Sequence, residues 1–295
     1  MRLPSWISQH LAALRALLVL TVLTGIGYPL VVTGIAQLPG LQHKADGSLV
    51  TVGNKTVGSA ELGQGFVDAK GDPLVQYFQS RPSAAGDGWD PTASGASNLG
   101  PESVVDTLPN PKVKGDEGKP SLLTQVCQRS LAVGTLEGVS GARPYCTSTG
   151  VGAVLGVFWS NGSTGTVTRV VSLNQACPAT PFVRTYDGVR VECATPGADY
   201  AKAVVTPIRG SAPAHPRVPS DAVTSSGSGL DPQISPAYAR LQAARIARVR
   251  DIPLATVQRL IAEYTSGRSV GFMGEPGVNV LQLNVALDKR YPYHG

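Results

Sequence analysis

The residues that most often carry out chemistry are scattered in this chain. None of its four histidines stands in a metal-ligand spacing such as H-x-x-x-H. His10 is expected in the N-terminal tail and His43 beside an apolar stretch. His215 is expected in a proline-rich connector, and His294 stands next to the last residue. A Ser/His/Asp hydrolase needs a rigidly positioned imidazole, so an exported hydrolase is disfavoured.

Two short motifs with catalytic associations also fail on their context. Gly267, Ser269 and Gly271 match the pattern G-x-S-x-G, but they follow a predicted helix, whereas a nucleophile elbow follows a strand. Gly115 and Lys119 lack the spacing of a phosphate-binding loop. We therefore expect no catalytic activity from this chain alone.

The composition restricts the remaining classes. The 295 residues carry a net charge of +5, and only 15% of them are charged, against roughly 25% in an ordinary soluble protein. The basic residues are spread thinly and aromatic residues make up only 6%. Nucleic-acid-binding proteins cluster their basic residues, so this function is excluded.

Residues 16–36 form the clearest physical signal. They contain no charged side chain, and 21 helical residues at about 1.5 Å each span roughly 31 Å, the thickness of a hydrocarbon core. A cleaved signal peptide is the alternative, since residues 34–36 loosely resemble a cleavage site. An uncleaved anchor is favoured because the stretch is longer than a signal core. Arg2 and Arg15 predict a cytoplasmic N-terminus and an extracytoplasmic domain after about residue 43.

Four cysteines in the exported part indicate two disulfides. Sequential pairing closes short loops and is favoured, namely Cys127 with Cys146 and Cys177 with Cys193. A four-thiolate zinc site is the alternative.

The exported part is predicted to be α+β. Residues 49–57 predict a strand–turn–strand, and residues 77–101 a shaped loop without regular elements. Strands at 154–159 and 167–173 flank the hairpin signal Asn161-Gly162. Ser235 and Pro236 begin a helix to about Arg250, and a second helix follows Pro253. Alternating apolar residues at 281–287 predict a half-buried strand.

Several turn-rich sequences occur in a distinctive order: 80–86 (SRPSAAG), 94–101 (SGASNLGP), 226–232 (SGSGLDP), 274–276 (GEP) and 278–288 (VNVLQLNVALD). In these the chain resembles the C subunit of the Kdp-type ATP-driven potassium transporter, the KdpC family. The resemblance covers roughly residues 11–106 and 216–290. It divides the chain into a tail and anchor (1–42), a core (43–106 and 216–295) and a β-rich insertion (107–215) with all four cysteines.

The resemblance implies a non-catalytic, single-pass subunit of a complex in the bacterial cell membrane. Its expected partners are a potassium-selecting channel-like subunit, a P-type ATPase subunit and a small single-helix subunit. The complex handles ATP and potassium, and no cofactor is expected on this chain alone. Asp288 and Lys289 are followed by Arg290, so the DKTG phosphorylation sequence of such an ATPase is missing here.

The resemblance also implies roles for particular residues. Family members are described as catalytic chaperones that raise the ATP affinity of the ATPase subunit, and a signature-like loop gives the nucleotide-related residues Ser226, Gly227, Ser228, Gly229 and Gln242. The expected interface residues are Ser80, Arg81, Pro82, Ser97, Asn98, Leu99, Leu230, Asp231, Pro232, Asn279 and Asn284.

An extracytoplasmic domain cannot meet cytoplasmic ATP, so the topology favours the interface role over nucleotide contact. Such a domain would dock over the outer mouth of the potassium-selecting subunit. A different class of function is a stand-alone, membrane-anchored extracellular binding or structural module.

Overall fold

The structure is a computed structural model that describes residues 4–294. The chain divides into two compact units, Met1–Glu61 and Leu62–Gly295. Each unit is described by itself.

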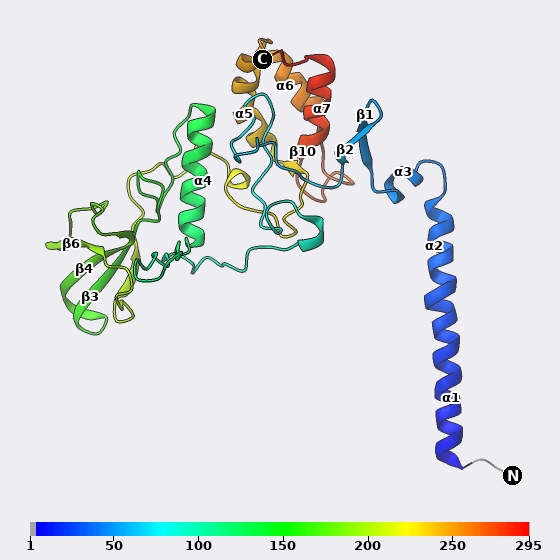
Figure 1. The fold of residues 1–295 in the computed structure, drawn as a ribbon, viewed down its shortest axis with the longest axis horizontal. Coiled ribbons are helices and arrows are strands. Elements are labelled where there is room, and N and C mark those ends of the chain that lie inside the picture. The colour runs from blue at the N-terminus through cyan, green and yellow to red at the C-terminus, as the bar shows by residue number, and fades with distance from the viewer. Residues whose placement is uncertain (1–3, 295) are drawn as a thin grey trace. The chain divides into compact units, whose positions relative to one another are not determined.

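The first unit contains one continuous helix, Ser5–Ala36, drawn in blue in Figure 1. With 32 residues it is long enough and apolar enough to cross a membrane, as the sequence predicts. It consists of α1 (Ser5–Leu20), a π-helical stretch (Thr21–Gly27) and α2 (Tyr28–Ala36). Within the π-helical register, the Tyr28 amide donates to the Leu23 carbonyl, five residues back. Pro29 follows at once, and because it has no N–H it cannot complete an α-helical bond to Gly25.

The rest of the first unit is short. Helix α3 (Gln42–Ala45) leads to β1 (Leu49–Val52) and β2 (Lys55–Ser59), which pair antiparallel. This hairpin confirms the predicted strand–turn–strand.

The second unit begins with a long segment that has few regular elements. Up to residue 121 its only helical turn among the described residues is the 3-10 turn Pro91–Ala93. The prediction of a shaped loop over residues 77–101 is confirmed.

A β-rich part follows, at the left of Figure 1. Its five-stranded sheet has the order β5-β6-β4-β3-β7. The strands are β3 (Val154–Asn161), β4 (Thr164–Ala176), β5 (Thr185–Tyr186), β6 (Val189–Ala194) and β7 (Val204–Pro207). Strands β3 and β4 form the predicted antiparallel hairpin, whereas β4 and β6 run parallel. Adjacent residues such as Val154 and Leu155 belong to different hydrophobic clusters, so both faces of the sheet are covered.

Helix α4 (Leu122–Glu137) lies in the same part and was not predicted from the sequence. Ser121 caps its first turn by accepting a bond from the Thr124 amide, and Gly138 ends it in the left-handed conformation (φ 67°). Two arginines, Arg129 within α4 and Arg143 after it, connect this part to the loop before α5. Arg129 donates to the Val223 carbonyl at 3.1 Å, and Arg143 to the Val218 carbonyl at 2.6 Å.

The C-terminal part holds three helices and a small sheet. Helix α5 (Pro236–Val249), capped by Ser235, and α6 (Leu254–Glu263), preceded by Pro253, confirm both predicted helices. The sheet has the order β8-β10-β9, formed by Gln233–Ile234, Gly277–Asn279 and Thr265–Ser266.

The strand predicted at residues 281–287 is wrong, because these residues lie in helix α7 (Val280–Arg290). Asn279 caps the helix by accepting a bond from the Gln282 amide. Val280, Leu283 and Leu287 are buried at helical spacing, and the buried residues at 281, 284 and 286 extend the same side. Apolar and polar residues do alternate over residues 281–287, but the same pattern also fits a helix with one wide buried face.

The sequential disulfide pairing is confirmed, and no thiolates remain for the alternative zinc site. Cys127 and Cys146 are joined with Cα atoms 5.5 Å apart, and Cys177 and Cys193 with Cα atoms 5.1 Å apart. The first bridge fixes α4 to the chain before β3. The second joins the ends of β4 and β6.

The two bridges should stabilise the unit to similar extents. They close loops of 19 and 16 residues, for which a chain-entropy treatment gives about 3 kcal/mol each. We expect the double variants C127S/C146S and C177S/C193S to lower the free energy of unfolding by about 2–4 kcal/mol each. Unfolding of the full chain in detergent measures this. An unchanged free energy for either variant would contradict the expected contribution of that bridge.

Candidate functional site

Several buried polar side chains of the C-terminal helices gather around the backbone of residues 75–79. This segment belongs to no strand, and the side chains of α5 and α7 satisfy its backbone groups. The Gln242 carboxamide accepts from the Gln79 amide at 2.7 Å and donates to the Gln79 carbonyl at 3.1 Å. Asn284 does the same for Phe78, at 2.9 and 3.0 Å. Each of these two side-chain amides therefore bonds both the N–H and the C=O of one backbone residue, as a neighbouring strand does in a sheet.

Two arginines complete this support. Arg245 donates to the carbonyls of Val75 and Tyr77, and Arg250 donates to the Gln76 carbonyl at 2.9 Å. Arg250 also pairs with Asp288 at 2.7 Å, and Asp288 accepts from the Tyr77 hydroxyl. Burial raises the pKa of Tyr77, and the bond to Asp288 adds to this effect. Successive backbone carbonyls are therefore each held by a charged side chain.

Arg245 also joins α5 to α4 through a buried ion pair. It contacts the Glu137 carboxylate at 3.1 Å, and the two side chains are 2% and 0% exposed. Burial raises the pKa of Glu137, whereas the charge of Arg245 acts in the opposite direction. A buried guanidinium is tolerated here because Glu137, Gln242 and backbone carbonyls satisfy its donors.

The turn-rich sequences meet one another beside this segment, and we call their contact the turn junction (residues 80–86, 94–95 and 224–232). Arg81 donates to the carbonyls of Thr224 and Ser225 and pairs with Asp231 at 3.1 Å. The Ser83 hydroxyl donates to the Gly229 carbonyl at 2.6 Å. From residues 94–101, the Gly95 amide donates to the Ser228 carbonyl at 3.0 Å.

Glycine is required at two points of this region. The Gly63 amide donates to the Leu230 carbonyl at 2.7 Å, and a Cβ at position 63 would lie 2.6 Å from the Asp231 carbonyl oxygen. Gly229 has a φ of +71°, and a Cβ there would lie 2.7 Å from that of Ala85. Close backbone approach explains why these sequences are rich in small residues.

The residues singled out from the sequence fall into two groups. Gln242, Asn279 and Asn284 are buried and hydrogen-bonded within the unit, so their side chains act as structural supports. Gln242 has no exposed surface, and its side-chain oxygen already accepts from the Gln79 amide and from Arg245. The resemblance had implied a nucleotide-related role for this residue.

The second group lies at or near the surface. The junction brings together Ser80, Arg81, Pro82, Leu230, Asp231 and Pro232 with the loop Ser226, Gly227, Ser228 and Gly229, of which Gly227 and Ser228 are exposed. Ser97 makes a local bond to the Leu99 amide, and Asn98 is exposed between them.

Sequence reasoning missed Tyr77, Arg245, Arg250 and Asp288 as parts of this site. In the sequence, Arg245 and Arg250 are ordinary charges at the end of a predicted helix, and nothing in their spacing shows that they turn inward. One signal was available: Arg245 follows Gln242 by three residues, so both lie on one face of α5.

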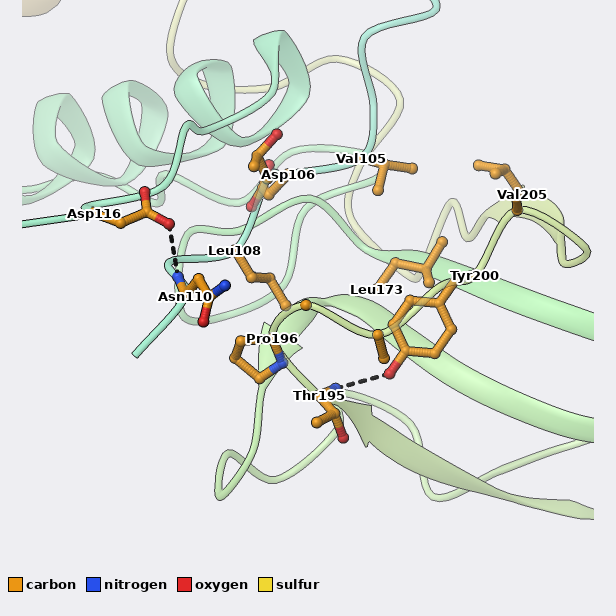
Figure 2. Close-up of a pocket in the computed structure, with 14 residues that line it drawn as sticks. Val105, Asp106, Leu108, Asn110, Asp116, Leu173, Thr195, Pro196, Tyr200 and Val205 are labelled. Atoms are coloured by element: carbon orange, nitrogen blue, oxygen red, sulfur yellow. Dashed lines mark hydrogen bonds between the residues drawn. The ribbon is translucent and has the colours of Figure 1, made fainter. Parts of the chain in front are cut away.

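A separate cavity of about 520 Å³ lies where residues 105–116 approach residues 195–205. Figure 2 shows Leu108 and Asn110 facing Thr195, Pro196 and Tyr200, with apolar side chains forming most of the lining. Its Asp116 carboxylate already accepts from the Asn110 amide at 2.8 Å.

Together these features define a protein with a helix long and apolar enough to cross a membrane and with a domain whose buried polar side chains hold the loops around residues 75–79. The family model described as "K+-transporting ATPase, c chain" matches residues 10–107 and 195–289. The chain belongs to this family, the KdpC subunit of the potassium-transporting ATPase. The matched regions contain the junction, the segment 75–79 and helices α5 to α7, whereas α4 and most of the five-stranded sheet lie between them.

Curated relatives carry the name "Potassium-transporting ATPase KdpC subunit". The protein of Beijerinckia indica is 34% identical over 285 residues, covering 96% of this chain and 95% of its own. That of Mycobacterium bovis is 35% identical over 281 residues, covering 95% and 98%. That of Kineococcus radiotolerans is 34% identical over 290 residues, covering 98% of both chains. Each of these matches covers nearly the whole length of both proteins, so it includes residues 108–194, which the family model leaves unmatched.

Replacing Gln242 by leucine tests its structural role. The change leaves the Gln79 amide and carbonyl and an Arg245 N–H buried without partners, at about 1–3 kcal/mol per group. We expect Q242L to lower the free energy of unfolding by about 2–5 kcal/mol, measured on the full chain in detergent. The matched control is Q128L, on the exposed side of α4. If Q242L kept wild-type stability and changed only nucleotide affinity, the residue would be a ligand contact instead.

Proposed function

We propose that this chain is the non-catalytic subunit that supports assembly of an ATP-driven potassium uptake complex and couples ATP hydrolysis to potassium import. The observation that carries the proposal is the family match, which contains the whole turn junction and its supporting helices. The single membrane helix supports it as well, since an accessory subunit must stay beside its partners in the bilayer. We expect these to be a channel-like subunit, a P-type ATPase subunit and a small single-helix subunit.

The orientation follows from charge. Arg2 and Arg15 precede the apolar stretch, and positive residues favour the cytoplasmic side. The second unit would then lie outside the cytoplasm, where disulfides persist, and all four cysteines are paired there. An outward domain would dock over the outer face of the potassium-selecting subunit.

This orientation makes any effect on ATP affinity indirect. The ATPase subunit hydrolyses ATP on the cytoplasmic side, so a catalytic chaperone on the other side must act through the membrane helices or the channel-like subunit. The complete burial of Gln242 supports an indirect effect. We infer that the turn junction holds the outer docking surface in shape.

The experiment that tests this function is recovery of the tagged full chain in detergent from potassium-starved cells, with mass spectrometry of the bound proteins. We expect a P-type ATPase and a channel-like subunit to be recovered, together with potassium-stimulated ATP hydrolysis. If the chain is recovered alone, the proposal fails, and a stand-alone extracellular module becomes the better explanation.

Packing of the membrane helix gives a second prediction. A Cβ at Gly27 would meet only the Val22 carbonyl oxygen at an ordinary 3.5 Å, and Gly34 has nothing within 4 Å. A larger residue at these positions therefore meets no obstacle within the chain. Small residues line membrane-helix contacts, so we expect G27L to reduce recovery of the partner subunits severalfold.

The matched control for G27L is T33L, six residues on and about 120° around the helix. It places the same leucine side chain at an exposed position on another side of the helix. Equal recovery with G27L and wild type would contradict a packed face at Gly27.

A further inference from the structure

The tip of the loop between β9 and β10, residues 269–273, exposes three apolar side chains together, and we call it the apolar tip. Val270, Phe272 and Met273 are 82%, 72% and 55% exposed. Single exposed apolar residues are common on protein surfaces and need no explanation. Three within four positions form a local patch, and exposed patches mark sites of interaction.

Backbone contacts fix the shape of the apolar tip. The Ser269 amide donates to the Met273 carbonyl at 2.8 Å, and the Met273 amide donates back at 2.9 Å. Below the tip, Arg268 and Glu275 form a forked ion pair at 2.8 and 3.0 Å, and the adjoining strand β9 pairs with β10. The tip therefore presents its side chains in one defined arrangement rather than on a floppy loop.

Val270 adds a second sign of constraint. Its φ is +53°, in the left-handed region that a β-branched residue rarely adopts. Such conformations are unfavourable and persist where the surroundings impose them, often at binding sites. Here the reversal of the chain at Val270 and Gly271 turns both Val270 and Phe272 outward.

The charges favour a protein partner over a lipid surface. Between residues 265 and 277 the only charged side chains are Arg268 and Glu275, and they pair with each other. A segment that binds anionic membranes usually carries unpaired Lys or Arg beside its apolar residues. A neutral, preformed group of an aromatic, a methionine and a valine instead resembles the anchor of a protein interface, where aromatic residues and Met are enriched.

We propose that the apolar tip inserts into an apolar pocket on the extracytoplasmic face of a partner subunit of the potassium transporter. This inference rests on the proposed function, because it takes the partner from the same complex. It goes beyond that function by assigning a docking element outside the turn junction. The pocket must accept one aromatic ring and one thioether chain without offering them a charge.

The same residues contain the G-x-S-x-G pattern, and the structure explains its presence differently. Gly271 has a φ of +84° and allows the reversal, while Ser269 closes the small hairpin with Met273. The pattern follows helix α6 and the two-residue strand β9, and the serine is followed by a turn and strand β10 rather than directly by a helix, so it is no nucleophile elbow. Its small residues serve the turn.

The first experiment places a benzophenone amino acid at position 272 of the full chain, co-expressed with its complex. Irradiation should yield an adduct with one transporter subunit, identified by mass spectrometry. The control carries the same group at Val113, which is 55% exposed in a loop of the β-rich part, and should yield no adduct with that subunit. Adducts with lipid alone, or none with a transporter subunit, would overturn the proposal even when the wild-type chain retains its partners.

The second experiment measures recovery of that subunit with F272A and M273A after detergent dilution. Removing a buried anchor typically weakens binding by tenfold or more, so we expect about a tenfold loss for F272A and less for M273A. V113A should leave recovery unchanged. Because these side chains are exposed in the free chain, the thermal stability of the chain should stay at the wild-type value, which separates docking from folding.

The outcomes distinguish the two proposals. Intact wild-type recovery with no effect of F272A and M273A rejects the apolar tip and leaves the subunit function standing. If the wild-type chain recovers no transporter subunit, the subunit function fails and the docking element falls with it.

Discussion

The packing of α5 and α7 depends on how the backbone of residues 75–79 is satisfied. The segment turns at residues 74–77 and is buried at Phe78 and Gln79, where an unpaired amide or carbonyl would cost about 1–3 kcal/mol. Gln242 and Asn284 supply the partners from α5 and α7. Phe78 can therefore be completely buried without a sheet beside it. Because each amide bonds both the N–H and the C=O of one residue, the segment is fixed in register.

The same arrangement explains how the unmatched part of the chain is attached. Arg245 reaches the carbonyls of Val75 and Tyr77 on one side and Glu137 on the other. Both charges are buried, so removing either one leaves the other without its counter-charge. Since Glu137 ends α4, which lies outside the family match, we infer that the β-rich part is integrated with the core rather than loosely appended.

Local signals made much of this fold predictable. Ser235 and Pro236 begin α5, Asn161 and Gly162 turn the hairpin, and the apolar length of residues 16–36 marks the membrane helix, because each depends on nearby residues alone. Helix α4 was missed because its buried face is small and polar, with Thr124, Ser130 and Gly134 beside Cys127. Helix α7 was misread because Leu281, Leu283 and Leu287 satisfy a strand period as well as a helix period. The support of residues 75–79 was beyond prediction, since its partners lie more than 160 positions away.

An accessory role places particular demands on a chain of this kind. A membrane helix confines the domain to the plane of its partners, which raises its effective concentration, so a second contact need not be large to hold. The polar side chains around residues 75–79 hold the loops in shape, and the exposed parts of the turn junction and the apolar tip remain available for contact. Such surfaces recognise a partner by shape more than by charge, because their ion pairs, such as Arg81 with Asp231, are made within the chain. A domain that influences a distant ATPase without reactive groups can act only through contacts whose free energy differs between states of its partner. A rigid junction suits this role, since a docking surface that yields cannot favour one state over another.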